Sequence, residues 1–425
     1  MAEALDRESW SREDWSAYHE EHLTALLERA ATRVPYYRAH WRARRAEGDT
    51  ASWHELANWP VLSKATLRQA PRSFVADDVR LWQLQRSSTS GTSGSPVTTW
   101  QSRRTARRWY ALFEARARRW YGVDRRDAWA IMGGQVVTPA SQTSPPFWVW
   151  NAALRQLYLS TLHLAPEHVP AYLTALRDHR VRHLYGYASS MYRLAQMVRE
   201  SGLDAPELVV AVSNAEPLLP HQRAMIGDVF RCPVRDSYGM SEIVAAASEC
   251  EHGSMHVWPD AGVIEVLEDR ADVPAAAGST GRLVCTGLLN ADMPLVRYDV
   301  GDRGALSPVD APQCTCGRTL PLVERLEGRD ADNLITRDGR RVFWLNPVFY
   351  GLPVREAQIV QVSRELVRVH LVLDPGQDAP QVDATIVSRL RQRVGDLDVQ
   401  IERVTEIPRG ANGKFRAVVN LVDAP

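Results

Sequence analysis

The spacing of apolar and polar residues predicts helices in the first quarter of the chain. Trp15, Leu23 and Leu26 recur at helical spacing among Arg and Glu within residues 8–45. Residues 103–126 are very basic, and aromatic residues recur among the arginines. This second pattern predicts an amphipathic helix with a solvated arginine face over an apolar stripe.

Further along, short apolar runs alternate with helical segments. Strands are expected at 81–84, 183–186 and 208–212, and helices at 170–180 and 189–201. Alternation of this kind favours an α/β fold with largely parallel strands. From about residue 262 the pattern changes to short β segments, and the last hundred residues contain two strands, 366–373 and 399–404, around a helix at 383–394. We therefore expect two domains, 1–328 and 329–425.

Composition excludes several classes of protein. The 51 Lys and Arg balance the 51 Asp and Glu, which argues against a nucleic-acid binder, and no apolar run is long enough to span a membrane. The polar N-terminus does not resemble a secretory signal, and five cysteines do not form a disulfide framework. We expect a cytoplasmic protein. Only Lys64 and Lys414 are lysines. Because the chain otherwise uses arginine for positive charge, each lysine is a candidate for a role that needs a compact ammonium on a flexible stem.

Residues 87–96 are drawn only from Ser, Thr, Gly and Pro. Glycines let backbone N–H groups turn toward an anion, and small hydroxyls add further donors, so this loop can bind phosphate oxygens. A flexible linker is the alternative, and the segment lacks the Gly-Lys-Ser/Thr ending of a Walker loop. The candidate nucleotide-binding residues here are Ser87, Ser88, Thr89, Ser90, Gly91, Thr92, Ser93 and Gly94.

Four further motifs follow in order. The first comes after an expected strand at Val234 and consists of Asp236, Ser237, Tyr238, Gly239, Met240, Ser241 and Glu242. The others are Arg297 to Asp302, Gly328-Arg329, and Pro408-Arg409 with Gly413-Lys414. In this order the five motifs resemble those of adenylate-forming enzymes, the superfamily of acyl-CoA ligases, peptide-synthetase adenylation domains and luciferases. The short chain and the Cys-x-Cys-Gly-Arg element at 314–318 most resemble the phenylacetate-coenzyme A ligase group.

The resemblance implies a fold and an activity. The fold would be a large α/β domain of layered sheets with a small β-barrel-like part, followed by a small mobile α+β domain. The activity would be ATP-dependent activation of a carboxylic acid as acyl-AMP, with release of pyrophosphate and transfer of the acyl group to coenzyme A or another acceptor, a thiol or an amine. ATP and Mg²⁺ would be required.

Residue roles follow from the same resemblance. Glu242 would bind Mg²⁺, a hard cation that prefers oxygen ligands. Asp302 would accept from both ribose hydroxyls, Arg329 would contact ribose or phosphate, and Lys414 would bridge the substrate carboxylate and the α-phosphate. Tyr238 would line the adenine site, and Asp236 would accept from the exocyclic amine. The remaining residues of the adenine site would be Asn214, Ala215 and Glu216.

Two departures from the pattern leave the acceptor open. Many acyl-CoA ligases have a lysine where this chain has Ser95, and many have Asp or Lys where this chain has Ala331. Adenylation followed by amide or nitrogen-nitrogen bond formation is therefore an alternative, and a non-catalytic nucleotide-binding homologue is another. The sequence does not indicate the oligomeric state, and a dimer is compatible with it.

A group of cysteine and histidine residues indicates a metal site. Cys250 and His256 lie in one turn-rich stretch and Cys314 and Cys316 in another, and three thiolates with one imidazole suit tetrahedral Zn²⁺. We expect a closed structural zinc site here, with free reduced cysteines as the alternative.

The acyl pocket is expected to use Gly133, Gly134, Tyr185, Gly186 and Tyr187, by analogy with the same family. Nearby aromatic residues favour an aromatic acid, although core packing would also explain them.

Overall fold

The computed structural model describes residues 1–88, 96–329, 332–343, 345–374, 376, 380–410 and 414–422, with the side chain of Arg329 excluded. The chain divides into two compact units. The large unit contains Met1–Val300 and Ala305–Arg325, and the small unit contains Gly301–Gly304 and Leu326–Pro425. The boundary expected after residue 328 stays a prediction.

Helices dominate the start of the large unit, as the apolar spacing predicts. Ser11 caps the second helix by accepting from the Asp14 N–H, and the Asp14 carboxylate accepts from the Ser11 N–H in return. Pro35 occupies the first position of the next helix, where its missing N–H costs nothing. These helices are α1 (Ala2–Asp6), α2 (Arg12–Arg33), α3 (Pro35–Ala46) and α4 (Lys64–Gln69).

A twelve-stranded sheet forms the centre of the chain, with strand order β11-β12-β13-β14-β10-β9-β8-β7-β6-β3-β5-β4. Strands β8, β7, β6, β3 and β5 run parallel, and β4 is antiparallel at the edge. This part contains β3 (Trp129–Met132), β4 (Trp148–Asn151), β5 (Gln156–Leu159), β6 (His183–Tyr187), β7 (Val210–Asn214) and β8 (Val234–Gly239).

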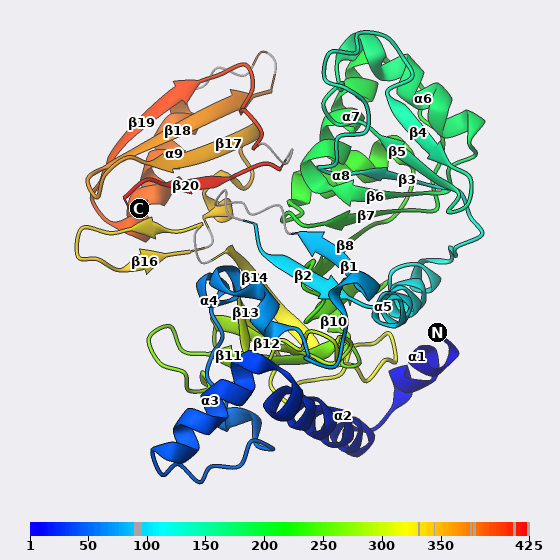
Figure 1. Ribbon diagram of the computed structural model, residues 1–425. Helices are drawn as coiled ribbons and strands as arrows, with labels where there is room; N and C mark the ends of the chain where they lie inside the picture. The colour runs from blue at the N-terminus through cyan, green and yellow to red at the C-terminus, as the bar shows by residue number, and fades with distance from the viewer. Residues whose placement is uncertain are drawn as a thin grey trace. The chain divides into compact units, whose positions relative to one another are not determined.

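Helices cover the parallel strands because both faces of such strands are apolar. Helices α6 (Val169–Asp178), α7 (Ala188–Ser201) and α8 (Pro220–Phe230) pack together against one face (Figure 1). Leu184 of β6 and Met191 of α7 are fully buried members of the shared core. On the other face, α5 (Arg103–Arg116) places Phe113 edge-on against Tyr185.

In the rest of the large sheet, β8 pairs with β9, β9 with β10, β10 with β14 and β11 with β12, each antiparallel. Six further strands make up this part. They are β9 (Ala246–Glu249), β10 (Met255–Val257), β11 (Gly262–Leu267), β12 (Gly281–Gly287), β13 (Tyr298–Leu306) and β14 (Leu322–Arg329). A separate two-stranded sheet pairs β1 (Gln85–Ser88) with β2 (Thr98–Gln101). Whether the β-rich part is barrel-like stays a prediction.

The small unit has an α+β arrangement. Helix α9 (Pro380–Val394) buries Val382, Ile386, Leu390 and Val394 in one core with residues of the strands, which is the spacing of one helix face. The four-stranded sheet has the order β19-β18-β17-β20, and β15 and β16 form a short hairpin. The strands are β15 (Leu334–Ile335), β16 (Arg341–Val342), β17 (Val354–Gln361), β18 (Leu366–Leu373), β19 (Asp398–Arg403) and β20 (Val418–Asn420).

The predicted α/β class and the smaller α+β unit are confirmed, but local boundaries differ. Residues 81–83 form a 3₁₀ turn, so the strand predicted at 81–84 begins only at Gln85. The helix predicted over 103–126 ends at Arg116, since the backbone leaves helical geometry at Ala117 (φ −111°) and turns left-handed at Gly122 (φ +73°).

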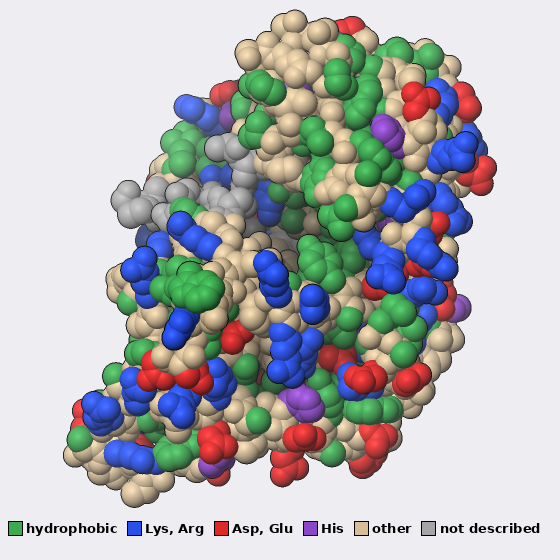
Figure 2. All heavy atoms as spheres, turned by 45° about the vertical axis from the view of Figure 1, so that its right-hand side comes forward, with side chains coloured by type: hydrophobic (Ala, Val, Ile, Leu, Met, Phe, Trp, Pro, Cys, Tyr) green, Lys and Arg blue, Asp and Glu red, His purple; other side chains and the backbone are tan. Residues whose placement is uncertain are grey.

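The arginines of α5 have the solvated face that the pattern predicts. Arg103, Arg104 and Arg107 are exposed, and basic and acidic side chains are interspersed over this side of the molecule (Figure 2). In the described part of the chain, no helix combines the length and apolarity needed to cross a membrane.

Candidate active site

Several predicted site residues lie at the carboxyl ends of four adjacent parallel strands. Met132 pairs with Gly186, Tyr187 with Asn214, and Ser213 with Asp236. Residues 133–134, 186–187, 214–216 and 237–242 therefore end or follow β3, β6, β7 and β8 at one edge of the sheet. Ligands of open α/β sheets bind at this edge. The structure thus brings together the segments expected to form the adenine and acyl sites.

Gly186 has a packing role that its sequence motif did not reveal. A Cβ atom at this position would lie 2.2 Å from the Met132 carbonyl oxygen and 2.8 Å from its carbonyl carbon. Only glycine permits this close approach of β6 to β3.

Three non-glycine residues near the candidate site have left-handed backbones: Ala215 (φ +61°), Ile243 (φ +51°) and Arg297 (φ +46°). Ala215 follows β7 directly, and Ile243 follows Glu242. A positive φ costs on the order of 1–3 kcal/mol for a residue other than glycine and is most unusual for a β-branched one such as isoleucine. Strain of this kind is concentrated in functional regions of proteins.

Polar atoms line the ends of β6 and β7. Ser189 Oγ, Ser213 Oγ and Asn214 Oδ1 are buried and have no hydrogen-bond partner among the described residues. Ser237 Oγ donates to the Ser213 carbonyl oxygen at 2.8 Å. Burial raises the pKa of Tyr185, and the nearby Ser237 and Asn214 side chains oppose that shift. Buried polar atoms without protein partners are expected where water or a ligand binds.

Asp236 lies within β8 rather than after it, which corrects the predicted position of this motif. Burial raises its pKa to about 7, and the like charge of Glu249 adds to the effect. The Ser237 N–H donates to Asp236 Oδ1 at 2.9 Å and opposes the shift. Glu249 accepts two hydrogen bonds from Arg223, at 3.0 and 2.8 Å. The role of Asp236 at adenine stays a prediction.

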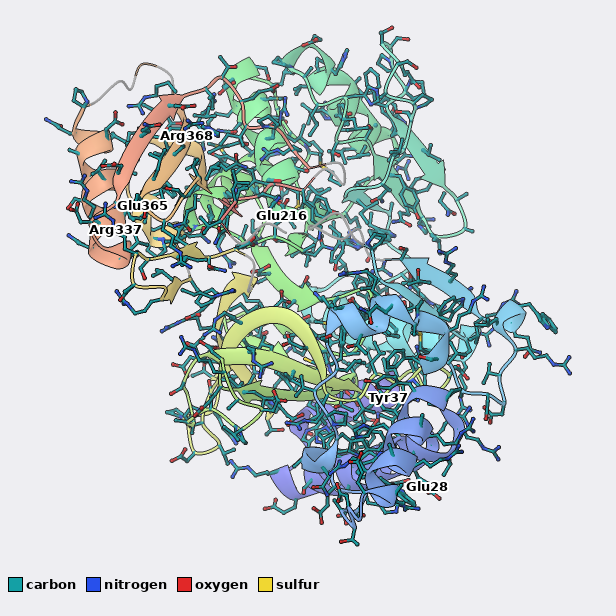
Figure 3. All side chains as sticks on the ribbon, turned by 60° about the vertical axis from the view of Figure 1, so that its left-hand side comes forward. Glu28, Tyr37, Glu216, Arg337, Glu365 and Arg368 are labelled. Carbon is teal, nitrogen blue, oxygen red and sulfur yellow. The ribbon has the colours of Figure 1, made fainter. Side chains whose placement is uncertain are left out.

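Glu216 forms a hydrogen bond that the sequence did not predict. Its Oε2 accepts from the Ser189 N–H at 3.0 Å, and Ser189 is in the first turn of α7. A carboxylate at this place satisfies one free N–H group and is favoured by the helix dipole. Glu216 lies just below the helices that cover the parallel strands in the view of Figure 3. The cap connects the segment after β7 to α7.

Glu242 lies in the turn after β8 and is only 6% exposed. The hydroxyl of Tyr298, itself fully buried, donates to Glu242 Oε1 at 2.9 Å. A buried carboxylate held in one orientation can offer its other oxygen to a hard cation such as Mg²⁺. Its donor chemistry therefore fits the predicted magnesium ligand.

Of the predicted phosphate loop, Ser87 and Ser88 end β1 and pair with Thr99 and Thr98. Thr89, Ser90, Gly91, Thr92, Ser93, Gly94 and Ser95 lie outside the described residues.

The remaining predicted residues belong to the small unit. Asp302 is half-buried on β13, and Lys414 is half-buried, with its carbonyl oxygen accepting from the Gly410 N–H at 3.0 Å. Arg329 is the last residue of β14. Gly328 before it has φ +100°, a conformation that favours glycine. Ala331 and Gly413 lie outside the described residues.

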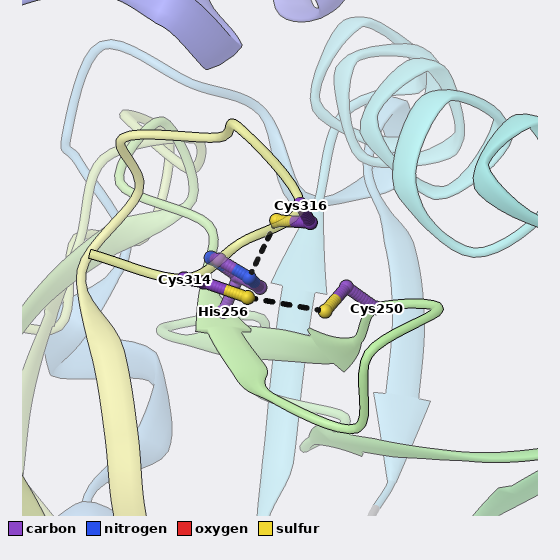
Figure 4. A group of neighbouring side chains, drawn as sticks. All are labelled: Cys250, His256, Cys314 and Cys316. Carbon is purple, nitrogen blue, oxygen red and sulfur yellow. Dashed lines mark hydrogen bonds between the residues drawn. The ribbon is translucent and has the colours of Figure 1, made fainter. Parts of the chain in front are cut away.

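The four predicted zinc ligands converge (Figure 4). The ligand atoms of Cys250, His256, Cys314 and Cys316 all lie within 4.8 Å of one another. Cys250 Sγ is 3.6 Å from Cys314 Sγ, and Cys316 Sγ is 3.3 Å from His256 Nε2. The edges of a tetrahedron around Zn²⁺ measure roughly 3.5–3.8 Å for such ligands. The donor set and its dimensions therefore fit zinc.

The surroundings of His256 also suit a metal. Burial lowers its pKa to about 4, so the imidazole is neutral. His256 Nδ1 lies 3.3 Å from the Leu320 carbonyl oxygen, which as the acceptor of the Nδ1 proton leaves the Nε2 lone pair free to ligate. Cys232 and Cys285 are buried outside the cluster. Zinc itself stays a prediction.

Comparisons with known proteins agree with this architecture. Residues 334–421 match the family model of the CapK C-terminal domain. Protein CapK of Staphylococcus aureus is 28% identical over 309 residues, which cover 71% of this chain and 66% of the relative. Phenylacetate-coenzyme A ligase of Thermus thermophilus is 29% identical over 260 residues, which cover 54% of this chain and 58% of the relative. The chain thus spans less than two thirds of either relative.

A solved structure resembles nearly the whole chain. The 2-hydroxyisobutyryl-CoA ligase, in its postadenylation state with an acyl-AMP, superimposes with a TM-score of 0.73 at 20% identity, covering 97% of this chain and 91% of that one. This match confirms the fold. Together with the motif order, the sequence and structure matches make the chain a relative of the phenylacetate-coenzyme A ligase-like group within the adenylate-forming superfamily.

Proposed function

We propose that the chain is an ATP-dependent ligase that activates a carboxylic acid as acyl-AMP and then transfers the acyl group. The observation that supports this most is the convergence of the motif segments at the carboxyl ends of β3, β6, β7 and β8, in a fold shared with a ligase that holds an acyl-AMP. The substrates are a small acid, ATP and an acceptor thiol or amine. Coenzyme A is a candidate acceptor because one relative is a coenzyme A ligase.

In the first step an oxygen of the substrate carboxylate attacks the α-phosphorus of ATP. The bond from that phosphorus to the bridging oxygen breaks, and its electron pair leaves with pyrophosphate. Two anions approach each other, so positive charge is needed where negative charge accumulates in the transition state. One such preorganised contact contributes about 3 kcal/mol. Lys414 is proposed to supply this charge, and Asp302 to hold the ribose.

Glu242 is proposed to hold Mg²⁺, whose charge would neutralise phosphate oxygens. Tyr298 keeps the Glu242 carboxylate in one orientation through its 2.9 Å hydrogen bond. Cys250, His256, Cys314 and Cys316 are proposed to hold a structural zinc ion, which would join the segment around β9 and β10 to the loop at 314–316. We expect no chemistry from that ion, because four protein ligands leave no open position.

ATP–pyrophosphate exchange with a panel of acids tests the proposal. We expect exchange that depends on one class of acid, with aromatic acids as the first to try because Tyr185 and Tyr187 are among the residues expected to line the acyl pocket. Adding coenzyme A or an amine afterwards separates a coenzyme A ligase from an amide synthetase by the product formed. ATP binding without exchange for any acid would instead indicate a non-catalytic homologue.

A further inference from the structure

A buried carboxylate lies between the four predicted zinc ligands and the strand that carries the predicted adenine site. Glu249 is the last residue of β9 and immediately precedes Cys250, one of those ligands. Glu249 is only 5% exposed. Burying a charge is costly unless hydrogen-bond donors satisfy it, so the partners of this carboxylate indicate what it does.

The hydrogen bonds of this carboxylate lead to β8. The Asp236 N–H donates to Glu249 Oε2 at 2.7 Å, and Arg223 donates to both carboxylate oxygens, at 3.0 and 2.8 Å. Arg223 also donates to the Val234 carbonyl oxygen. Glu249 therefore holds the backbone of β8 directly at Asp236, and through Arg223 at Val234.

The strand pairing around Glu249 connects the same two sites. His256 on β10 pairs with Ser248 on β9, and Ser248 pairs with Ser237 on β8. One residue along β8 from that pair, Asp236 bonds to the Glu249 side chain. All of these residues belong to the large unit. A predicted zinc ligand is therefore separated from the predicted adenine motif by a single strand.

The predicted zinc ligands hold the segment that carries Glu249. Cys250 directly follows β9, His256 lies on β10, and Cys314 and Cys316 come from the loop before β14 (Figure 4). Strands β9 and β10 have only four and three residues, and a short pair of strands is marginally stable by itself. A metal that joins their turn to the loop would fix Cys250, and with it the adjacent Glu249.

We propose that Glu249 is a positioning residue that couples the zinc site to adenine binding. The metal fixes the turn between β9 and β10, the turn fixes the Glu249 carboxylate, and the carboxylate sets the position of Asp236 in the predicted adenine site. This coupling rests on the proposed adenylation function and extends it to a connection between two sites of the large unit. Coupling between two ligands is reciprocal, so an adenine nucleotide should also tighten zinc binding by the same factor.

The test measures the affinity for AMP with and without zinc. Isothermal titration with AMP would compare the zinc-loaded protein with protein from which a chelator has removed the zinc. Typical coupling energies predict roughly 10-fold weaker AMP binding without zinc. Competition with a chelating dye should in turn show zinc binding roughly 10-fold tighter when AMP is present.

Two substitutions of Glu249 separate this coupling from a purely structural role. Glu249→Ala should bind AMP weakly whether or not zinc is present, because the connection through the carboxylate is removed. Glu249→Gln keeps an acceptor for the Asp236 N–H but loses the ion pair with Arg223. It should therefore show a smaller effect of zinc on AMP affinity than wild type does.

Glu114→Gln is the matched control. Glu114 is 7% exposed and accepts from the Arg118 side chain at 3.1 Å and from the Arg125 N–H at 2.9 Å, so it too is a buried carboxylate that holds an arginine and a backbone N–H. Both partners lie between α5 and β3. This variant should keep the full wild-type effect of zinc on AMP affinity.

The outcomes are distinguishable. Wild-type AMP affinity that does not depend on zinc, or Glu249 variants that keep the full wild-type zinc effect, would overturn the coupling and leave the proposed function intact. A wild type that binds no zinc would overturn the coupling as well. A wild type that binds neither AMP nor ATP in either state would refute the proposed function and this coupling with it.

A spectroscopic measurement covers the case in which the zinc-free protein unfolds. Co²⁺ can replace zinc at nitrogen and sulfur ligands, and its visible absorption reports the geometry of the site. Saturating AMP should change this absorption in wild type and in Glu114→Gln but not in Glu249→Ala. A wild-type spectrum that AMP leaves unchanged would contradict the coupling.

Discussion

Removing the Tyr298 hydroxyl should weaken both the fold and the candidate magnesium site. In Tyr298→Phe the buried Glu242 carboxylate loses a 2.9 Å hydrogen bond while the ring still fills its space. Hydrogen bonds to charged groups contribute about 1.5–3 kcal/mol. With an unfolding entropy of about 2.1 cal/mol/K per residue, a large unit of about 320 residues should melt roughly 3 °C lower for a loss of about 2 kcal/mol.

Tyr172→Phe is the matched control. Tyr172 is also fully buried, but its hydroxyl donates to the neutral Ser160 carbonyl oxygen at 2.6 Å. A neutral hydrogen bond contributes about 1 kcal/mol, so this variant should melt only roughly 1.5 °C lower.

Circular dichroism melting measures stability, and ATP–pyrophosphate exchange at varied Mg²⁺ measures the site. Tyr298→Phe should need more Mg²⁺ for half-maximal exchange, whereas Tyr172→Phe should not. The reasoning is refuted if Tyr298→Phe melts like wild type, or if its Mg²⁺ requirement matches that of the control.

Three further predictions follow from individual side chains. Wild type should bind about one equivalent of zinc per chain, measured by elemental mass spectrometry. Cys314→Ser should lose this zinc, whereas Cys232→Ser should retain it. A wild-type protein without metal would exclude the zinc site. Burial raises the pKa of Asp236 from 3.8 to about 7, so between about pH 4 and 7 the folded state keeps a proton that the unfolded state loses, and stability falls as pH rises. The stability of Asp236→Asn relative to wild type, measured by urea denaturation, should therefore be greater at pH 8 than at pH 5. An equal difference at both pH values would contradict the raised pKa. Lys414→Ala should lower the exchange rate by orders of magnitude with an unchanged melting temperature, and full activity would remove its assigned role.

The periodic parts of the fold could be predicted from sequence because burial enforces their spacing. Strand β18 lies over 366–373 as expected, and α7 begins one residue before the predicted 189–201. Segments without strong periodicity were misjudged. Leu81 to Leu84 are followed by a strand rather than forming one, since a short apolar run does not distinguish a strand from a 3₁₀ turn.

Motifs did not predict the contacts between residues that are far apart in the sequence. The cap of α7 by Glu216 joins residues 27 positions apart, and the Tyr298 bond to Glu242 joins residues 56 apart. No spacing rule connects such pairs, because the tertiary fold rather than the local sequence sets their proximity. The four predicted zinc ligands were the exception, since clustered Cys and His residues are rare enough to indicate one another, and the structure brings their ligand atoms together.

Mass spectrometry of the adenylate formed from a mixture of acids with ATP and Mg²⁺ tests the central claim most directly. The account predicts one acyl-AMP, or a small chemically related set, with an equal amount of pyrophosphate. It also predicts loss of both products in Lys414→Ala. ATP that remains intact with every acid, despite measurable ATP binding, would contradict the account.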